Sequence, residues 1–95
     1  MRLKDEYRQV ISSTFKELFP EHKLYLFGSR TDDSKKGGDI DLLILGETKL
    51  NLNEIGKFRI ELWKQLEEQK IDIVSFTNEE KSTFKELIFE EKIEI

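Results

Sequence analysis

Residues 24–45 read LYLFGSRTDDSKKGGDIDLLIL, two apolar runs joined by a polar loop. The first run ends at Gly28, and the second opens with Asp39-Ile40-Asp41. Side chains in a strand alternate between its two faces, so Asp39 and Asp41 point the same way while Ile40 points into the core. Carboxylates held side by side repel each other unless a cation lies between them, and hard oxygen ligands of this kind suit Mg²⁺. The stretch therefore predicts a metal site that faces a turn.

The loop between the two runs has the residues of a phosphate-binding turn. Glycine at position 28 allows a close approach of ligand to backbone, and the Ser29 hydroxyl with nearby N–H groups can contact phosphate oxygens. Arg30, Lys35 and Lys36 add local positive charge. A plainer interpretation stays open, because Gly-Ser is a common turn and the two aspartates could be a solvated strand end.

Composition limits the classes of function. The chain has 95 residues, which predicts a single domain over residues 1–95. Domains of this size often gain stability from a homo- or hetero-oligomer. Its net charge of −4 disfavours direct binding to nucleic acid. The lack of cysteine excludes disulfides, thiol catalysis and Cys-based zinc sites. No apolar run approaches the roughly 18 residues that span a bilayer, so we expect a soluble, cytoplasmic protein without membrane contact.

Hydrophobic periodicity predicts an order of helix, strand, strand, helix, strand, helix. Pro20 ends the first helix, Asn51 or Asn53 is expected to cap the second, and Thr77-Asn78-Glu79-Glu80 reads as a capping box for the third. This order predicts a small α/β or α+β domain with helices packed on a mixed sheet. The helices are expected at Leu3–Phe19, at Leu52–Gln69 and after Thr77, and the strands at Lys23–Phe27, Asp39–Leu45 and Lys70–Phe76.

The last helix and the tail leave alternatives open. Phe84, Leu87 and Ile88 form the apolar stripe of this helix, and we interpret them as core or partner interface rather than as a platform for a base. The tail, residues 89–95, alternates acidic and apolar residues. It could continue the helix, pair as an edge strand or fray.

The third strand carries a further candidate ligand. Alternation puts Asp72 on one face with Val74 and Phe76, and a carboxylate on a mostly apolar strand needs a reason. One reason is that it joins Asp39 and Asp41 where neighbouring strands meet, as ligands for one or two Mg²⁺ ions. Paired metals about 3.5–4 Å apart can activate an attacking oxygen and stabilise a leaving one. The alternative is a salt bridge from Asp72 to a lysine.

Gly28-Ser29-Arg30, then Gly38-Asp39-Ile40-Asp41-Leu42, then Asp72 on a later strand resemble the nucleotidyltransferase superfamily related to DNA polymerase beta. Within it, the short length resembles the minimal nucleotidyltransferases, the MNT proteins of bacteria and archaea. The resemblance covers residues 24–76. The sequence departs from relatives in the loop, where they often carry Ser or Thr in place of Gly38 and a glycine in place of Asp32-Asp33. This difference concerns the loop conformation and nucleotide preference, not the carboxylates.

The resemblance implies a Mg²⁺-dependent enzyme that transfers a nucleotidyl group, AMP from ATP, to an acceptor hydroxyl. Asp72 would also help to activate that hydroxyl. Ser29 would hold the terminal phosphates. The implied catalytic and metal-binding residues are Asp39, Asp41 and Asp72, around two ions. The implied nucleotide-binding residues are Gly28, Ser29 and Arg30.

The resemblance also implies a partner. MNT proteins are antitoxins paired with small helical HEPN proteins, and some transfer AMP to a tyrosine of the toxin. Two rival functions remain. The chain could be a catalytically silent antitoxin, a binding module that neutralises its partner by contact. It could also transfer nucleotides to a small molecule, as antibiotic-modifying relatives do, although the sequence offers no room for a separate acceptor domain.

Overall fold

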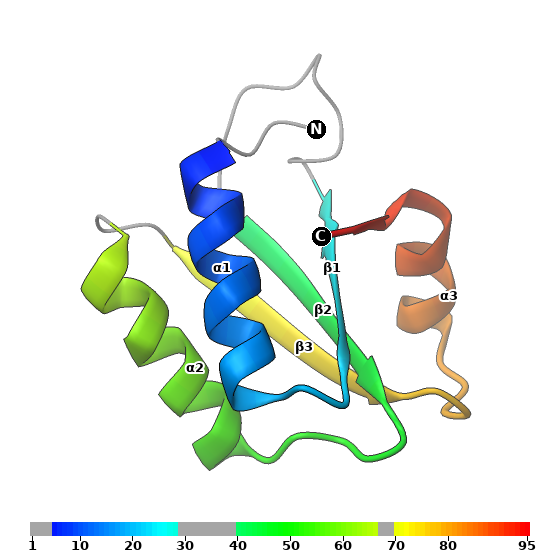
Figure 1. Ribbon diagram of the computed structural model, residues 1–95. Helices are drawn as coiled ribbons and strands as arrows, with labels where there is room; N and C mark the ends of the chain where they lie inside the picture. Colours follow the sequence, from blue (N-terminus) through cyan, green and yellow to red (C-terminus); the bar gives the residue numbers. More distant parts are fainter. Residues whose placement is uncertain (1–4, 29–39, 67–69) are drawn as a thin grey trace.

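The computed structural model describes residues 5–28, 40–66 and 70–95 (Figure 1). Its first six elements follow the predicted order α-β-β-α-β-α, which confirms the expected fold class. Within these residues, no helix has both the length and the apolar character needed to cross a membrane. The elements are α1 (Asp5–Leu18), β1 (Lys23–Phe27), β2 (Ile40–Gly46), α2 (Leu52–Gln65), β3 (Ile71–Thr77), α3 (Thr83–Glu91) and β4 (Ile93–Glu94).

The strands form one sheet in the order β3-β2-β1-β4. β1 runs antiparallel to both of its neighbours, β2 and β4, whereas β2 and β3 run parallel. In the tail, α3 continues to Glu91, and the short β4 then pairs with Tyr25 and Leu26 of β1 as an edge strand. Two of the three alternatives left open by the sequence, continued helix and edge strand, therefore each hold for part of the tail. Figure 1 shows α1 and α2 together on one side of the sheet and α3 apart from them.

The face of the sheet under α1 and α2 carries the larger core. Leu42 and Ile44 of β2 are fully buried there against residues of both helices. Phe15, Phe19 and Phe58 pack with ring centroids 5.7–5.9 Å apart, which ties α1 to α2. Aromatic pairs at this spacing contribute about 0.5–1.5 kcal/mol each beyond the area that they bury. This core holds β2 in the middle of the sheet.

The opposite face, under α3, carries a smaller core. Its buried residues are Phe27, Leu43, Leu45 and Ile88, and the last of these comes from α3. Of the apolar stripe predicted for this helix, only Ile88 is buried: 51% of Phe84 and 64% of Leu87 are exposed. α3 therefore covers part of its face of the sheet and presents apolar side chains to the surface.

Two helix ends differ from the sequence prediction. α2 is capped by Asn51, as expected, but ends at Gln65 instead of Gln69, because Leu66 adopts an extended backbone. Thr77 and Glu80 exchange the two hydrogen bonds of a capping box, yet no helix follows at once. The helix begins at Thr83, and its N-cap is Ser82.

A buried lysine explains the late start of α3. Lys85 is only 4% exposed, and its ammonium donates hydrogen bonds to the carbonyl oxygens of Thr77, Asn78 and Glu80 at 2.7–2.9 Å. Because one ammonium group donates to all three carbonyl oxygens, it holds the turn between β3 and α3 in a non-helical conformation. Lys85 therefore anchors α3 to the end of β3.

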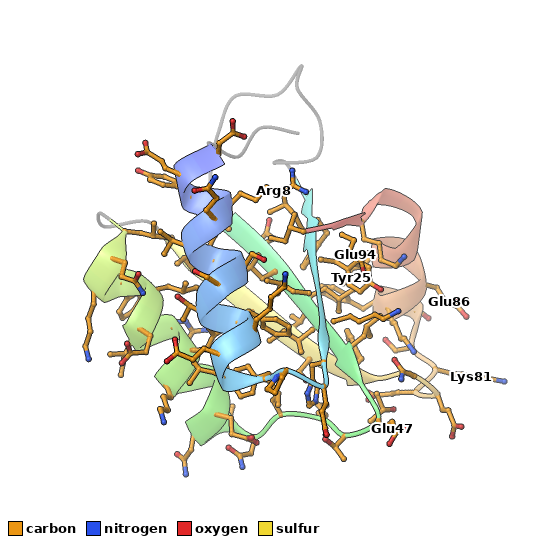
Figure 2. The ribbon with its side chains drawn as sticks, in the orientation of Figure 1. Arg8, Tyr25, Glu47, Lys81, Glu86 and Glu94 are labelled. Carbon is orange, nitrogen blue, oxygen red and sulfur yellow. The ribbon has the colours of Figure 1, made fainter. Side chains whose placement is uncertain are left out.

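We expect Lys85→Met to lower the free energy of unfolding by about 2 kcal/mol, because it leaves three carbonyl oxygens of the turn without their donor. For a domain of this size, that corresponds to a fall of roughly 10 °C in the melting temperature. Thermal unfolding followed by circular dichroism measures it. Lys81→Met is the matched control, since Lys81 is exposed in the same connection and points away from the molecule (Figure 2). Equal melting temperatures for the two variants would contradict the anchoring role.

Candidate functional site

The register of β2 with β3 brings two of the predicted carboxylates together. Asp41 and Asp72 are direct partners in the parallel ladder, and both are partly buried. Alternation along β2 places Asp41 on the same face as Leu43 and Leu45, which is the face that α3 covers in part. Neighbouring strands lie about 4.8 Å apart, so the two acids stand side by side at one end of this face.

Gly28 at the end of β1 completes the described part of the site. Phe27 is the register partner of Asp41 on the antiparallel side, so the chain leaves β1 directly beside this carboxylate. Gly28 has a φ of +76°, a conformation that other residues adopt only with strain. A Cβ built on it would overlap a carboxylate oxygen of Asp41 and lie 3.1 Å from its Cγ. Both the backbone and the space therefore require glycine.

The other predicted site residues lie outside the described part of the chain. These are Ser29, Arg30 and Asp39. Among the described residues, no group of three or more histidine, cysteine, aspartate or glutamate side chains forms a potential metal cluster. The described donor set is therefore the pair Asp41–Asp72, and carboxylate oxygens at this separation suit a hard cation such as Mg²⁺.

The chain also forms a hollow of about 620 Å³ at the opposite end of the sheet. It lies between the start of β1 and the end of β2, where a His22 ring nitrogen is 3.0 Å from the carbonyl oxygen of Thr48. Glu47, one of its lining residues, lies at this far end (Figure 2). Sequence reasoning did not identify this hollow, since its lining residues come from separate connections. It contains neither Asp41 nor Asp72.

We expect Gly28→Ala to destabilise the fold by about 1–2 kcal/mol, the cost of a left-handed conformation for a residue with a Cβ. The new methyl group also displaces the Asp41 carboxylate. Gly56→Ala is the control: Gly56 lies within α2, and nothing lies within 4 Å of a Cβ built there. This second change should stabilise the helix by about 0.5–1 kcal/mol. Urea unfolding of both variants measures the difference, and shifts of the same sign would contradict the assignment.

The fold of the chain is shared with several solved structures. One is a chain from the complex of tri-AMPylated Shewanella oneidensis HEPN toxin with MNT antitoxin, with 17% identity, a TM-score of 0.73 and coverage of 97% of this chain and 71% of that one. A toxin–antitoxin structure with AMP-PNP has 18% identity and a TM-score of 0.74, covering 90% of this chain and 69% of that one. A structure described as a putative nucleotidyltransferase from Sulfolobus solfataricus has 18% identity and a TM-score of 0.50, covering 95% of this chain and 82% of that one.

At such identities, these likenesses show the fold alone. A comparison with curated proteins found no match. Membership rests on the sequence model of a family, which matches residues 9–95 and so includes β1, β2, β3 and both described carboxylates. The family is described as "Polymerase beta, Nucleotidyltransferase". The resemblance seen in the sequence is thereby confirmed, and the chain belongs to the polymerase beta nucleotidyltransferase family.

Proposed function

We propose that the chain is a Mg²⁺-dependent nucleotidyltransferase that transfers AMP from ATP to an acceptor hydroxyl. The observation that carries this proposal is the register pair Asp41–Asp72 beside the turn at Gly28. Two carboxylates held on neighbouring strands of one sheet form the donor set that a hard cation needs. Family membership supports the reaction class, because the family is one of nucleotidyltransferases.

The predicted residues outside the described part of the chain complete this proposal. Asp39 precedes β2 by one residue, and we assign it as a further metal ligand with Asp41 and Asp72. Ser29 and Arg30 follow Gly28 and are assigned to the phosphates.

In the proposed reaction, the acceptor oxygen forms a bond to the α-phosphorus while the bond to the α,β-bridging oxygen breaks. Pyrophosphate leaves with that electron pair, and the acceptor proton passes to the Asp72 carboxylate. Gly28 leaves room for phosphate oxygens next to the backbone, and Asp41 would hold a metal ion, since a bare carboxylate would repel the phosphate. Bound Mg²⁺, two ions in this proposal, would supply charge stabilisation at the reacting phosphate. The contribution of the protein is mainly position and preorganised charge.

We further propose that the acceptor is a tyrosine of a helical HEPN-family partner, so that the chain acts as an antitoxin in the cytoplasm. Support comes from the shared fold with a complex whose HEPN toxin carries AMP groups and whose other component is an MNT antitoxin. Asp41 and Asp72 are only partly buried, as carboxylates that act on a protein acceptor need to be. A contact-only antitoxin is the second candidate function, since complexes of this fold are also consistent with neutralisation by binding.

We expect Asp41→Asn and Asp72→Asn each to abolish Mg²⁺-dependent ATP binding, measured by isothermal titration calorimetry. Without metal, Asp72→Asn should be at least as stable as the wild type, because it removes the repulsion between like charges on adjacent strands, about 0.5 kcal/mol. When Mg²⁺ and ATP are added, the melting temperature should rise for the wild type and should not change for the two aspartate variants. Glu47→Gln is the control, a carboxylate at the far end of β2. ATP binding that survives both aspartate changes would refute the proposed site.

The acceptor is tested by incubating the chain with a HEPN-family partner, Mg²⁺ and ATP, followed by mass spectrometry of the intact partner. The enzyme function predicts a mass increase of one or more AMP groups, lost in Asp41→Asn and when a single partner tyrosine is changed to Phe. Contact-only neutralisation predicts an unmodified partner that Asp41→Asn still binds and inhibits. These results separate the two candidate functions.

A further inference from the structure

An exposed phenylalanine lies on the same face of the sheet as the carboxylates. Phe84, in the first turn of α3, is 51% exposed. Its ring meets the ring of buried Phe27 at 6.3 Å between centroids and 82°, and the ring of Phe76 at 6.3 Å and 47°. Both neighbours touch it at an angle, so Phe84 is held by aromatic contacts while about half of it stays open to solvent.

These contacts place Phe84 close to the carboxylate pair. Phe27 is the register partner of Asp41, whereas Phe76 lies on the same face of β3 as Asp72 but four residues farther along the strand. Phe84 therefore bridges β1 and β3 on the α3 side of the sheet, the side on which Asp41 and Asp72 form a row. The surface next to this row is apolar and includes partly buried Val74.

The sequence favoured core or partner interface for Phe84, but from its exposure and ring contacts we infer that Phe84 is the surface on which the base of the nucleoside triphosphate stacks. This inference rests on the proposed function, which puts the triphosphate at the turn of Gly28 and its α-phosphate at Asp41 and Asp72. In this arrangement, the ribose and base extend away from Gly28, along the face that carries Val74 and Phe84. A flat base placed there covers apolar surface that α3 leaves exposed, and base–aromatic stacking tolerates every base because each has a π-face.

The second exposed apolar residue of α3 does not share this position. Leu87 is 64% exposed, one turn farther along the helix. Exposed hydrophobic area therefore continues past Phe84, but the ring contacts with Phe27 and Phe76 belong to Phe84. Leu87→Ala serves as a matched control, because it removes exposed apolar area from the same helix without touching the aromatic cluster.

The test compares Phe84→Leu, Phe84→Tyr, Leu87→Ala and the wild type by calorimetry, with Mg²⁺-ATP and with Mg²⁺-tripolyphosphate. Leucine keeps an apolar side chain without a ring, and tyrosine keeps the ring. We expect Phe84→Leu to weaken ATP binding about tenfold and to leave tripolyphosphate binding unchanged. Phe84→Tyr and Leu87→Ala should bind both ligands as the wild type does. Quenching of the fluorescence of ethenoadenosine triphosphate on binding should be lost in Phe84→Leu and retained in Phe84→Tyr.

Other outcomes overturn the stacking role or separate its failure from that of the proposed function. Equal ATP affinity in Phe84→Leu and the wild type would show that the base does not stack there. An equal loss of ATP and tripolyphosphate would show an effect on the shape of the site and not on the base. If the wild type binds Mg²⁺-ATP and Asp41→Asn does not, the proposed function stands whatever Phe84 does. If the folded wild type binds no Mg²⁺-ATP, the proposed function and the stacking role fail together.

Discussion

The parallel pairing of β2 with β3 is the constraint on which the candidate site depends. Asp41 and Asp72 belong to segments separated by the whole of α2, and only this register makes them neighbours. A shift of the pairing by one residue would turn one acid toward the α1–α2 core and the other toward α3. Such a shift of β2 would put the Asp41 carboxylate into the α1–α2 core, where Ile40 and Leu42 are fully buried, and an unpaired carboxylate is costly to bury there. Hydrophobic packing on one face therefore fixes the spacing of charges on the other.

The two faces of the sheet have different roles for this reason. The face under α1 and α2 carries most of the buried apolar residues and supplies stability. The face under α3 buries fewer residues, and α3 itself is tied to β3 by the Lys85 ammonium and its three carbonyl acceptors. A polar anchor of this kind positions a short helix without filling the whole face with apolar side chains. The carboxylates, Val74 and one side of Phe84 can thus remain accessible on a small domain.

Much of the fold could be predicted from the sequence because its signals are local. Alternation and helical periodicity identified the order of elements, and Asn51, one of the two candidate caps, is the N-cap of α2. The start of α3 was predicted wrongly. Thr77 and Glu80 do form the hydrogen bonds of a capping box, as the sequence suggests, but the helix begins only at Thr83. What delays the helix is Lys85, whose burial depends on tertiary packing that no local pattern reveals. The pairing of the tail with β1 is non-local in the same way.

The candidate site was predictable in kind but not in geometry. A carboxylate among apolar residues marks Asp72 in the sequence, yet its partner across the ladder follows only from the β2–β3 register. The same holds for Gly28, whose need for glycine comes as much from the Asp41 carboxylate as from its own φ. Asp39, Ser29 and Arg30 remain sequence predictions.

The proposed function also has a consequence for water. Nucleotidyl transfer competes with hydrolysis unless water is kept from the α-phosphate. In the described part of the chain, α3 is the helix over the face that carries Asp41 and Asp72, and its Ile88 belongs to the buried cluster with Phe27, Leu43 and Leu45. A stacked base at Phe84 would shield one side of that row, and a protein acceptor that approaches Asp72 would shield another. Under this proposal, the substrates themselves close the site, which makes transfer depend on the acceptor being bound.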